Sequence, residues 1–475
     1  MQRRKFIQLT ALSGAAMSLP DFSLGGKRND FPVVRTAPQF RKFSSPAVER
    51  IISEVKKSIG NKEMAWLFEN CFPNTLDTTV DFEMINGRPD TYVITGDIDA
   101  MWLRDSTAQV APYLPLCKED KNLQNLMKGV INRQVQCILR DPYANAFYKD
   151  EDKISEWKET DITEMKAGIH ERKWEIDSLC YPVRLAYEYW KETGDLSPFD
   201  TDWLKAMDLV VKTFKEQQRF HNPGPYTFQR KTSWATDGVP LSGYGYPARP
   251  NGLICSIFRP SDDATIFPYL IPSNFFAVVS LDQMAKLTVM LKGGKSVANE
   301  ATALAQVVRK ALLKNAMIRH ERAGNIYAYE VNGFGSYHLM DDANVPSLLA
   351  LPYLNCVNVN DAVYQNTRKF ILSENNPFFF KGKSGEGIGS PHTGLDRIWP
   401  IGIIMRGLTS KNETEIKYCL NILQKTHAGT GFMHESFEKD DAAKYTRKWF
   451  AWANTLFGEF VWKTFRERPH LLKAI

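Results

Sequence analysis

The chain has 475 residues, of which 43% are hydrophobic and 24% are charged. These proportions are ordinary for a globular protein, and the length allows a large core. The formal net charge is only +6, and no dense stripe of lysine and arginine is interleaved with aromatic residues, which argues against binding to nucleic acid. Aromatic residues make up 12% of the chain, and their rings can line carbohydrate sites as well as cores.

The first 26 residues are typical of an export signal. Arg3, Arg4 and Lys5 form a basic start, and residues 6–19 are apolar or small. The two arginines also fit a twin-arginine variant. This apolar run is too short to span a bilayer, and no later uncharged stretch is long enough to do so. We therefore expect an exported, periplasmic protein whose mature part has no membrane span.

Cysteine and histidine spacing gives no sign of a metal centre. The seven cysteines form no CxxC pair, and their odd count and apolar surroundings favour buried free thiols. The eight histidines include no HxH or HExxH pair, and there is neither an EF-hand spacing nor a GxSxG elbow. We expect no metal and no cofactor, although a calcium ion bound by loop aspartates stays an open alternative.

Beyond Ser45 the hydrophobic period is mostly helical. Pro112 should bend or end the second helix, and Gly293-Gly294 should separate two of the longest. The twelve predicted helices cover residues 47–71, 105–114, 121–140, 181–193, 199–219, 273–292, 296–317, 345–354, 358–373, 400–409, 412–426 and 446–466.

The connections alternate between long and short loops, which predicts five helical hairpins and leaves the first and last helices to pair. Six such pairs form an all-α (α/α)6 barrel with its long loops at one mouth, whereas an irregular bundle or solenoid is the alternative. Short β-hairpins are predicted at 77–98, around Asn86-Gly87, and in a region from 221 to 258. Without a low-complexity linker, residues 27–45 read as an N-terminal extension and 46–475 as one domain.

The long loops repeatedly place acidic residues beside aromatic, arginine or asparagine side chains. Carboxylates, amides and aromatic faces match the polar edges and apolar faces of a sugar ring, whereas phosphate would require glycine-rich loops and basic groups. Each residue also has a structural explanation, such as a helix-start ion pair for Arg104 with Asp105 or a core position for Trp102. The candidate sugar-binding residues are Asp97, Trp102, Arg104, Asp105, Asp263, Asp341, Asn344, His392 and His434. Further clusters of the same kind are DPYANAF, with Asp141 and Asn145, and WEIDSLCYPVR, with Asp177 and Arg184.

The adjacent pair Asp262 and Asp263 stands between Pro260 and an apolar, aromatic run. Two carboxylates buried together are costly, so at least one should have an unusual pKa or a dedicated partner. An acidic turn capped by Ser261 is the structural alternative. Among hydrolytic mechanisms, catalysis by two carboxylic acids is what remains.

Several long blocks resemble glycoside hydrolase family 125, the exo-α-1,6-mannosidases, in order from about residue 50 to 465. They include VITGDIDAMWLRDSTAQV, FRPSDDATIFPYLIPSNFFAV, MDDANVPSLLALPYL and GTGFMHESF. The resemblance implies an (α/α)6 barrel and metal-independent, inverting removal of terminal α-1,6-linked mannose, as found in trimmed N-glycans. It places the general acid on Asp262 and the general base on Glu435. Trp102, Arg104, Asp105 and His392 fall in blocks expected to shape the sugar subsite.

An inverting site needs roughly 6.5 to 9.5 Å between its carboxyl groups, so that a water molecule fits. We expect the pKa of Asp262 to be raised by Asp263 and by burial, because a general acid must be protonated. Two alternatives remain: a glycosidase for another sugar or linkage, and a glycan-binding protein without turnover.

Overall fold

The computed structural model describes residues 31–475, so the predicted export signal lies outside the described residues. The α-helices are α2 (Pro46–Ser58), α3 (Lys62–Cys71), α4 (Asn74–Thr78), α5 (Leu103–Val110), α6 (Lys121–Arg140), α7 (Ile176–Thr193), α8 (Thr201–Gln217), α9 (Ile271–Thr288), α10 (Lys295–Asn315), α11 (Ala362–Ile371), α12 (Pro400–Leu408), α13 (Glu413–Lys425), α14 (Ala451–Glu467) and α15 (Pro469–Lys473). Short 3-10 helices lie at η1 (Pro38–Phe40), η2 (Ala111–Leu116) and η3 (Ala235–Asp237).

The strands are short and form small antiparallel sheets, which lie between the helices. They are β1 (Val80–Ile85), β2 (Arg88–Val93), β3 (Met101–Trp102), β4 (Ala146–Phe147), β5 (Asp161–Ile162), β6 (Ile169–Glu171), β7 (Gln229–Arg230), β8 (Tyr269–Leu270), β9 (Met317–His320), β10 (Gly324–Tyr327), β11 (Glu330–Val331), β12 (Tyr337–His338), β13 (Phe379–Lys381), β14 (Glu386–Ile388), β15 (Arg397–Ile398), β16 (Ser436–Glu438) and β17 (Asp441–Thr446).

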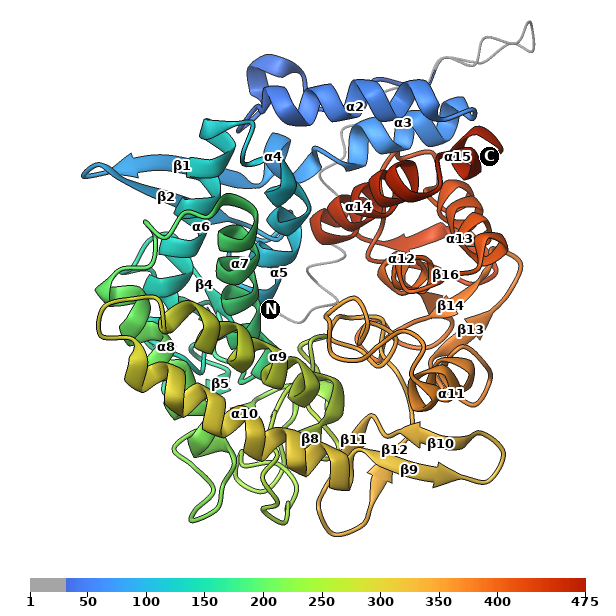
Figure 1. Cartoon of the computed structure of the whole chain (residues 1–475). Helices are drawn as coiled ribbons and strands as arrows, with labels where there is room; N and C mark the ends of the chain where they lie inside the picture. The colour runs from blue at the N-terminus through green and yellow to red at the C-terminus, as the bar shows by residue number, and fades with distance from the viewer. Residues whose placement is uncertain (1–30) are drawn as a thin grey trace, which may run out of the picture.

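The longer helices are arranged around a common centre (Figure 1). On the inside, α14 packs against α5, α5 against α7, α7 against α9, and α12 against α14. On the outside, α6 packs on α7 and α8, α10 on α9 and α8, and α13 on α12. The fold is therefore helix-rich, with an inner set of helices whose ends surround one region of the molecule.

The two ends of the chain meet, as the loop pattern predicts, because α14 packs against α3 and α4. Asn454 Nδ2 donates to Asn74 Oδ1 at 3.0 Å, and the hydroxyls of Thr75 and Thr455 lie 2.7 Å apart. These four side chains are buried, so their hydrogen bonds fix how the ends align.

The helix predicted over 47–71 is wrong in one detail, because it is broken between α2 and α3. Gly60 N–H donates to Leu472 O at 2.9 Å, and a Cβ on Gly60 would lie 2.6 Å from Lys473 O. Asn61 then caps α3 by accepting the N–H of Glu63 and Met64. The break makes room for the C-terminal segment.

The helix predicted over 345–354 is absent, and these residues form buried turns. Pro346 and Pro352 interrupt the backbone donors that a helix needs. The carboxylate of Asp341 instead accepts the N–H groups of Leu348 and Leu349, at 2.8 and 3.0 Å. The apolar pattern of this largely buried segment therefore predicted a helix where the structure has turns.

Other observed helix boundaries differ from the predicted ones. The second predicted helix ends as α5 and continues as η2 around Pro112, as expected. Helix α7 begins at Ile176, earlier than the predicted residue 181, with Pro182 inside it. The last helix begins only at Ala451, because the preceding residues form β17.

The hairpin predicted at 77–98 is confirmed as β1 and β2, joined by Asn86 and Gly87 with φ values of 51° and 79°. The region 221–258 is not a hairpin, since its one strand, β7, pairs with the distant β5. All seven cysteines are free. In residues 31–475, no helix has the length and apolar character needed to cross a membrane.

Candidate active site

Several residues of the site, some predicted and some not, lie at or before the first residues of the inner helices. Arg104 is the second residue of α5, and Glu175 directly precedes α7. Asp262 lies in the loop that leads to α9, and Glu435 lies in the loop that leads to α14. Helix starts carry unpaired N–H groups and a positive dipole, which suits a region rich in carboxylates.

Arg104 is the centre of a buried acidic cluster, and its side chain is only 3% exposed. Its Nη1 donates to Glu175 Oε2 at 2.5 Å and to Asp177 Oδ2 at 3.2 Å. Its Nη2 donates to Asp262 Oδ1 at 3.1 Å, and its Nε lies 3.6 Å from Asp105 Oδ2. The Arg104–Asp105 pair is thus one part of a larger buried network rather than an isolated helix-start ion pair.

Asp262 is held in a left-handed backbone conformation, with φ at 64°. For a residue with a side chain this conformation costs on the order of 1 kcal/mol, so its surroundings must enforce it. The Asp262 N–H donates to Arg259 O at 2.9 Å, and the Asp262 carbonyl accepts from Lys173 Nζ at 2.8 Å. Lys173 is fully buried and lies 3.0 Å from Asp237 and 3.2 Å from Glu171.

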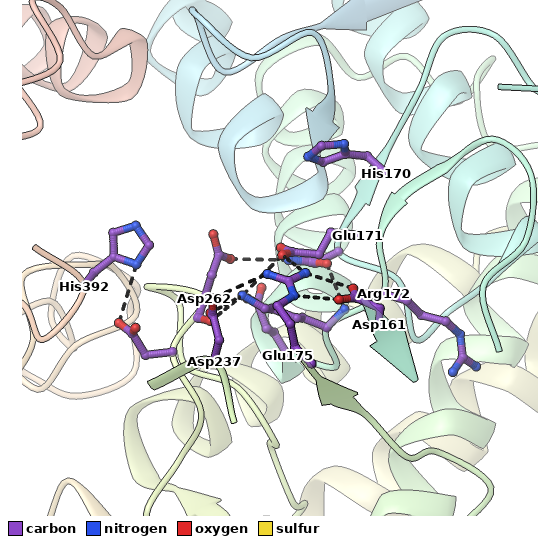
Figure 2. Close-up of polar contacts among 12 residues, drawn as sticks. Asp161, His170, Glu171, Arg172, Glu175, Asp237, Asp262 and His392 are labelled. Carbon is purple, nitrogen blue, oxygen red and sulfur yellow. Dashed lines mark hydrogen bonds and ion pairs between the residues drawn. The ribbon is translucent and has the colours of Figure 1, made fainter. Parts of the chain in front are cut away.

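Further charged side chains near Asp262 extend the hydrogen-bond and ion-pair network around Arg104. Figure 2 shows Asp161, Glu171 and Glu175 gathered near Asp262, whereas Arg172 points away from them. Asn145 Nδ2 lies 3.3 Å from both Asp262 Oδ1 and Glu171 Oε2. Asp262 is therefore held through its backbone and through its carboxylate at the same time.

The expected pKa of Asp262 is wrong in direction. Burial acts to raise it, but the charges of Arg104 and Lys173 and the hydrogen bond with Glu175 together outweigh burial, and the pKa is lowered. The raised pKa values belong to its neighbours: burial raises the pKa of Glu175 well above its usual range and those of Asp177 and Asp105 to about 6. Because Arg104 lies far away along the chain, the sequence did not reveal it as the dominant partner.

Glu435 belongs to a second part of the site and directly precedes β16. Its Oε1 is 3.6 Å from Arg447 Nε, and Arg447 Nη1 is 3.6 Å from Asp97. The neighbouring His434 stacks on Tyr445 with ring centroids 3.8 Å apart. Burial lowers the pKa of His434 to about 4, so the ring is neutral at physiological pH.

The positive charge of Arg447 interacts with carboxylates in both parts of the site. Its pKa is raised because the charges of Glu435, Asp97, Asp105 and Asp262 outweigh its burial. The proposed acid and the proposed base therefore act on one guanidinium, although Asp262 is bound by Arg104 and Glu435 is paired with Arg447.

The remaining predicted residues make three separate sets of contacts. Trp102 lies in β3 against His170, with ring centroids 5.1 Å apart, and its buried Nε1 has no protein acceptor within residues 31–475. Asp263 turns to His392, with 3.6 Å between Oδ2 and Nδ1. Asp341 and Asn344 bind within their own loop: Asp341 accepts backbone N–H groups, and Asn344 Nδ2 donates to Asp342 at 3.0 Å.

Three residues of the site were missed by the sequence prediction: Lys173, Glu175 and Arg447. The run ERKWEID, in which charged residues flank a tryptophan directly before a helix, is the signal that could have indicated the first two. Arg447 has no comparable signal, because it reaches the site by the pairing of β16 with β17. Throughout residues 31–475, no group of three or more His, Cys, Asp or Glu side chains has an arrangement that could hold a metal ion.

Comparison with known proteins places the chain in a family. A family model described as "Metal-independent alpha-mannosidase (GH125)" matches residues 61–462. The "Meiotically up-regulated gene 157 protein" of Schizosaccharomyces pombe is 41% identical over 459 residues, which cover 93% of this chain and 90% of that protein.

A solved structure from Streptococcus pneumoniae is also similar. It is 42% identical, with a TM-score of 0.86 over 90% of this chain and 100% of the other. That protein is described as a metal-independent alpha mannosidase, in a non-productive substrate complex with alpha-1,6-mannobiose. The chain is therefore a glycoside hydrolase that belongs to the GH125 family of metal-independent alpha-mannosidases.

Proposed function

We propose that this enzyme is an exo-acting, inverting α-1,6-mannosidase in which Asp262 is the general acid and Glu435 the general base. The observation that carries the assignment is the position of both carboxylates around one charged centre. Asp262 and Glu435 come from loops far apart in the sequence, and both interact electrostatically with Arg447. An inverting hydrolase needs two acids that face one substrate from different sides.

In the proposed reaction, Asp262 donates a proton to the glycosidic oxygen while the bond to the anomeric carbon breaks. Glu435 takes a proton from a water molecule that attacks the opposite face of the sugar. Trp102 lies on the strand that leads into α5, and it is proposed to offer the sugar an aromatic face and its buried indole N–H, which has no acceptor among the described residues. The α-1,6 linkage is proposed from the mannobiose bound by the Streptococcus pneumoniae relative.

The fold supports the same proposal. We propose that the inner and outer helices form an (α/α)6 barrel in which the turns at 345–354 replace one inner helix. The loops that precede the inner helices would then gather at one mouth and form the subsite for a terminal sugar. Asp97, His392 and His434 are proposed to contribute to this subsite, together with Arg104 and Asp105.

The assignment is tested with Asp262→Asn and Glu435→Gln. Each variant should lose roughly 10²-fold or more of its turnover on α-1,6-mannobiose, because general acid and base catalysis contribute about that much. Circular dichroism should show an intact fold, and NMR of the first-formed mannose should show the β-anomer. A near-native rate in either variant, or an α-anomer as first product, would contradict the roles.

An enzyme of the same family with another linkage preference is the competing function. A panel of α-1,2-, α-1,3-, α-1,4- and α-1,6-mannobioses separates the two, because the proposal requires preferential release of mannose from the last. Equal rates on several linkages would remove the specificity but leave the two acids in place.

We also propose that residues 1–26 direct export to the periplasm, that 27–45 form an extension, and that 46–475 form one domain acting on N-glycans or mannans. Supporting this, a contiguous core cluster runs from Ala47 to Leu472. Fractionation of a bacterium expressing the full chain, with mass spectrometry of the mature N-terminus, tests export. Limited proteolysis tests the domain, which should resist cleavage between these core positions.

A further inference from the structure

The proposed acid poses a problem, because Arg104 lowers the pKa of Asp262 although a general acid must carry a proton. The proton must therefore be kept nearby until a substrate enters. Asp262 has one buried neighbour, Glu175, that shares both its cation and a side-chain hydrogen bond.

We infer that Glu175 is a positioning residue for Asp262: the two carboxyl groups share one proton beside Arg104, and Glu175 passes it to Asp262 when a sugar fills the site. This inference rests on the proposed function. It adds a residue to which neither the sequence motifs nor the family resemblance gave a role.

The geometry around Glu175 supports a shared proton. Its Oε2 accepts from Arg104 Nη1 at 2.5 Å and from Ser178 Oγ at 2.8 Å. The other oxygen, Oε1, is buried, and no N–H or hydroxyl within residues 31–475 donates to it. A buried carboxyl oxygen without a donor is costly when ionised but is satisfied when it carries a proton that faces Asp262.

The number of carboxylates around Arg104 also indicates that the cluster retains a proton. Arg104 alone faces four carboxylates: Glu175, Asp177, Asp262 and Asp105. Beyond these, Glu171 and Lys173 act on Asp262, and Arg447 acts on Asp105 and Asp262. Carboxylates this close in a buried site cannot all ionise easily, so the cluster retains at least one proton.

The difference in burial indicates that Glu175, rather than Asp262, carries this proton. Glu175 is fully buried, whereas the Asp262 side chain is 18% exposed. The hydrogen bond between them raises the pKa of Glu175 and lowers that of Asp262. In the empty site the proton therefore lies on Glu175, and Asp262 is the carboxylate held by Arg104.

Sugar binding would reverse this preference. A mannoside excludes water from Asp262, and an ionised carboxylate against a glycosidic oxygen lacks a donor. The proton then moves from Glu175 to Asp262, and the negative charge moves to Glu175, where Arg104 and Ser178 stabilise it. Asp262 passes the proton to the leaving oxygen, Glu435 gains one from water and releases it to solvent, and the Glu175–Asp262 pair takes one back.

The test compares two substrates in Glu175→Gln. Glutamine keeps the shape and the bond to Arg104 but has no proton to give. α-1,6-Mannobiose needs a protonated leaving group, whereas α-mannosyl fluoride depends little on an acid. We expect a loss of roughly 10²-fold on the mannobiose and less than about threefold on the fluoride, with the alkaline limb of kcat/KM moved to lower pH.

Asp177→Asn is the matched control, because Asp177 is also buried on Arg104 and the variant makes the same carboxyl-to-amide substitution. It should alter both substrates to the same extent. Glu175→Asp keeps a transferable proton and should restore an alkaline limb close to that of the wild type. Equal losses on both substrates in Glu175→Gln, or an unmoved alkaline limb, would overturn the inference.

Asp262→Asn separates this inference from the proposed function. If Asp262→Asn loses activity selectively on the mannobiose and Glu175→Gln does not, only the role of Glu175 fails. If neither variant is selective, the acid itself was wrongly assigned. Should Glu175→Gln not fold, NMR of wild-type enzyme with ¹³C-labelled glutamate carboxyls decides: one glutamate must stay protonated at neutral pH, and its absence refutes the shared proton.

Discussion

The two halves of the proposed site are built differently. On the acid side, Arg104 is 3% exposed and bonds directly to three carboxylates, and Lys173 fixes the backbone of Asp262. On the base side, Arg447 is 24% exposed, and its contact to Glu435 is 3.6 Å long. One half is a closed network of hydrogen bonds around a buried arginine, whereas the other is a longer ion pair whose arginine is partly exposed.

This difference fits the two tasks. A general acid must keep a proton in a defined place, which favours a dry, crowded cluster that controls where protons reside. A general base in an inverting enzyme must leave room for a water molecule, which favours a longer and wetter contact. The predictions below test whether the acid side is the part that depends on buried charge.

Arg104→Leu should have the largest effect. It leaves buried carboxylates without their cation, which costs about 3 kcal/mol or more of unfolding free energy at neutral pH. The folded-state pKa values of these carboxyls then lie above their unfolded values, so stability is lost as the pH rises and returns as the pH falls. Urea unfolding at about pH 7 and pH 5 measures this, and a deficit that does not shrink at the lower pH contradicts a charge-based cause.

Gly431→Ala should have the next effect, on the loop that carries Glu435. Gly431 has a φ of 80°, and a Cβ there would lie 2.7 Å from Val34 and 2.8 Å from Trp66. Gly429 has a φ of 74° with open space around it, so Gly429→Ala isolates the backbone cost. We expect losses of about 2 kcal/mol for Gly431→Ala and about 1 kcal/mol for Gly429→Ala.

Thermal unfolding and turnover on α-1,6-mannobiose measure the outcome. Gly431→Ala should also lower turnover, because the displaced loop carries Glu435. Equal stability in the two alanine variants would mean that the N-terminal segment around Val34 does not support the base side.

Parts of this arrangement follow from local sequence. Asn86-Gly87 predicts its hairpin because only certain residues accept the required φ, and the predicted helix 121–140 is confirmed because its cap and its hydrophobic period agree. The turns at 345–354 could not be recognised, since a run buried on every side has no informative period. Secondary structure can thus be predicted from the sequence where residues close together in the chain determine it.

The charge network is not local. Arg104 is separated by 71 residues from Glu175 and by 158 from Asp262, so no spacing rule connects them. The expected direction of the Asp262 pKa shift was wrong for this reason: the adjacent Asp263 is visible in the sequence, whereas the distant Arg104, Lys173 and Glu175 that lower the pKa are not. The acid and base assignments came from the family resemblance and stay predictions.

Asp263→Asn should have a smaller effect. Burial acts to raise the pKa of Asp263, but His392 outweighs it, and the pKa is lowered. An ionised group of this kind contributes stability above its unfolded pKa, and this contribution is lost as the pH falls through the folded pKa. The variant should be about 1 kcal/mol less stable at neutral pH, and this difference should disappear as the pH falls through the lowered pKa of Asp263. A difference that persists in acid would assign Asp263 a role other than its charge.

Arg447→Leu should have the smallest effect on stability and gives the sharpest test of the comparison. Because the side chain is partly exposed and its ion pairs are 3.6 Å long, the loss should stay within about 1 kcal/mol. Turnover on α-1,6-mannobiose should still fall roughly 10-fold to 10²-fold, since Arg447 orients the carboxylate that must hold the attacking water. Arg447→Lys keeps the charge and should retain more of the rate. A stability loss as large as that of Arg104→Leu would mean that both halves depend equally on buried charge, and the contrast between the buried network at Asp262 and the longer ion pair at Glu435 would be wrong.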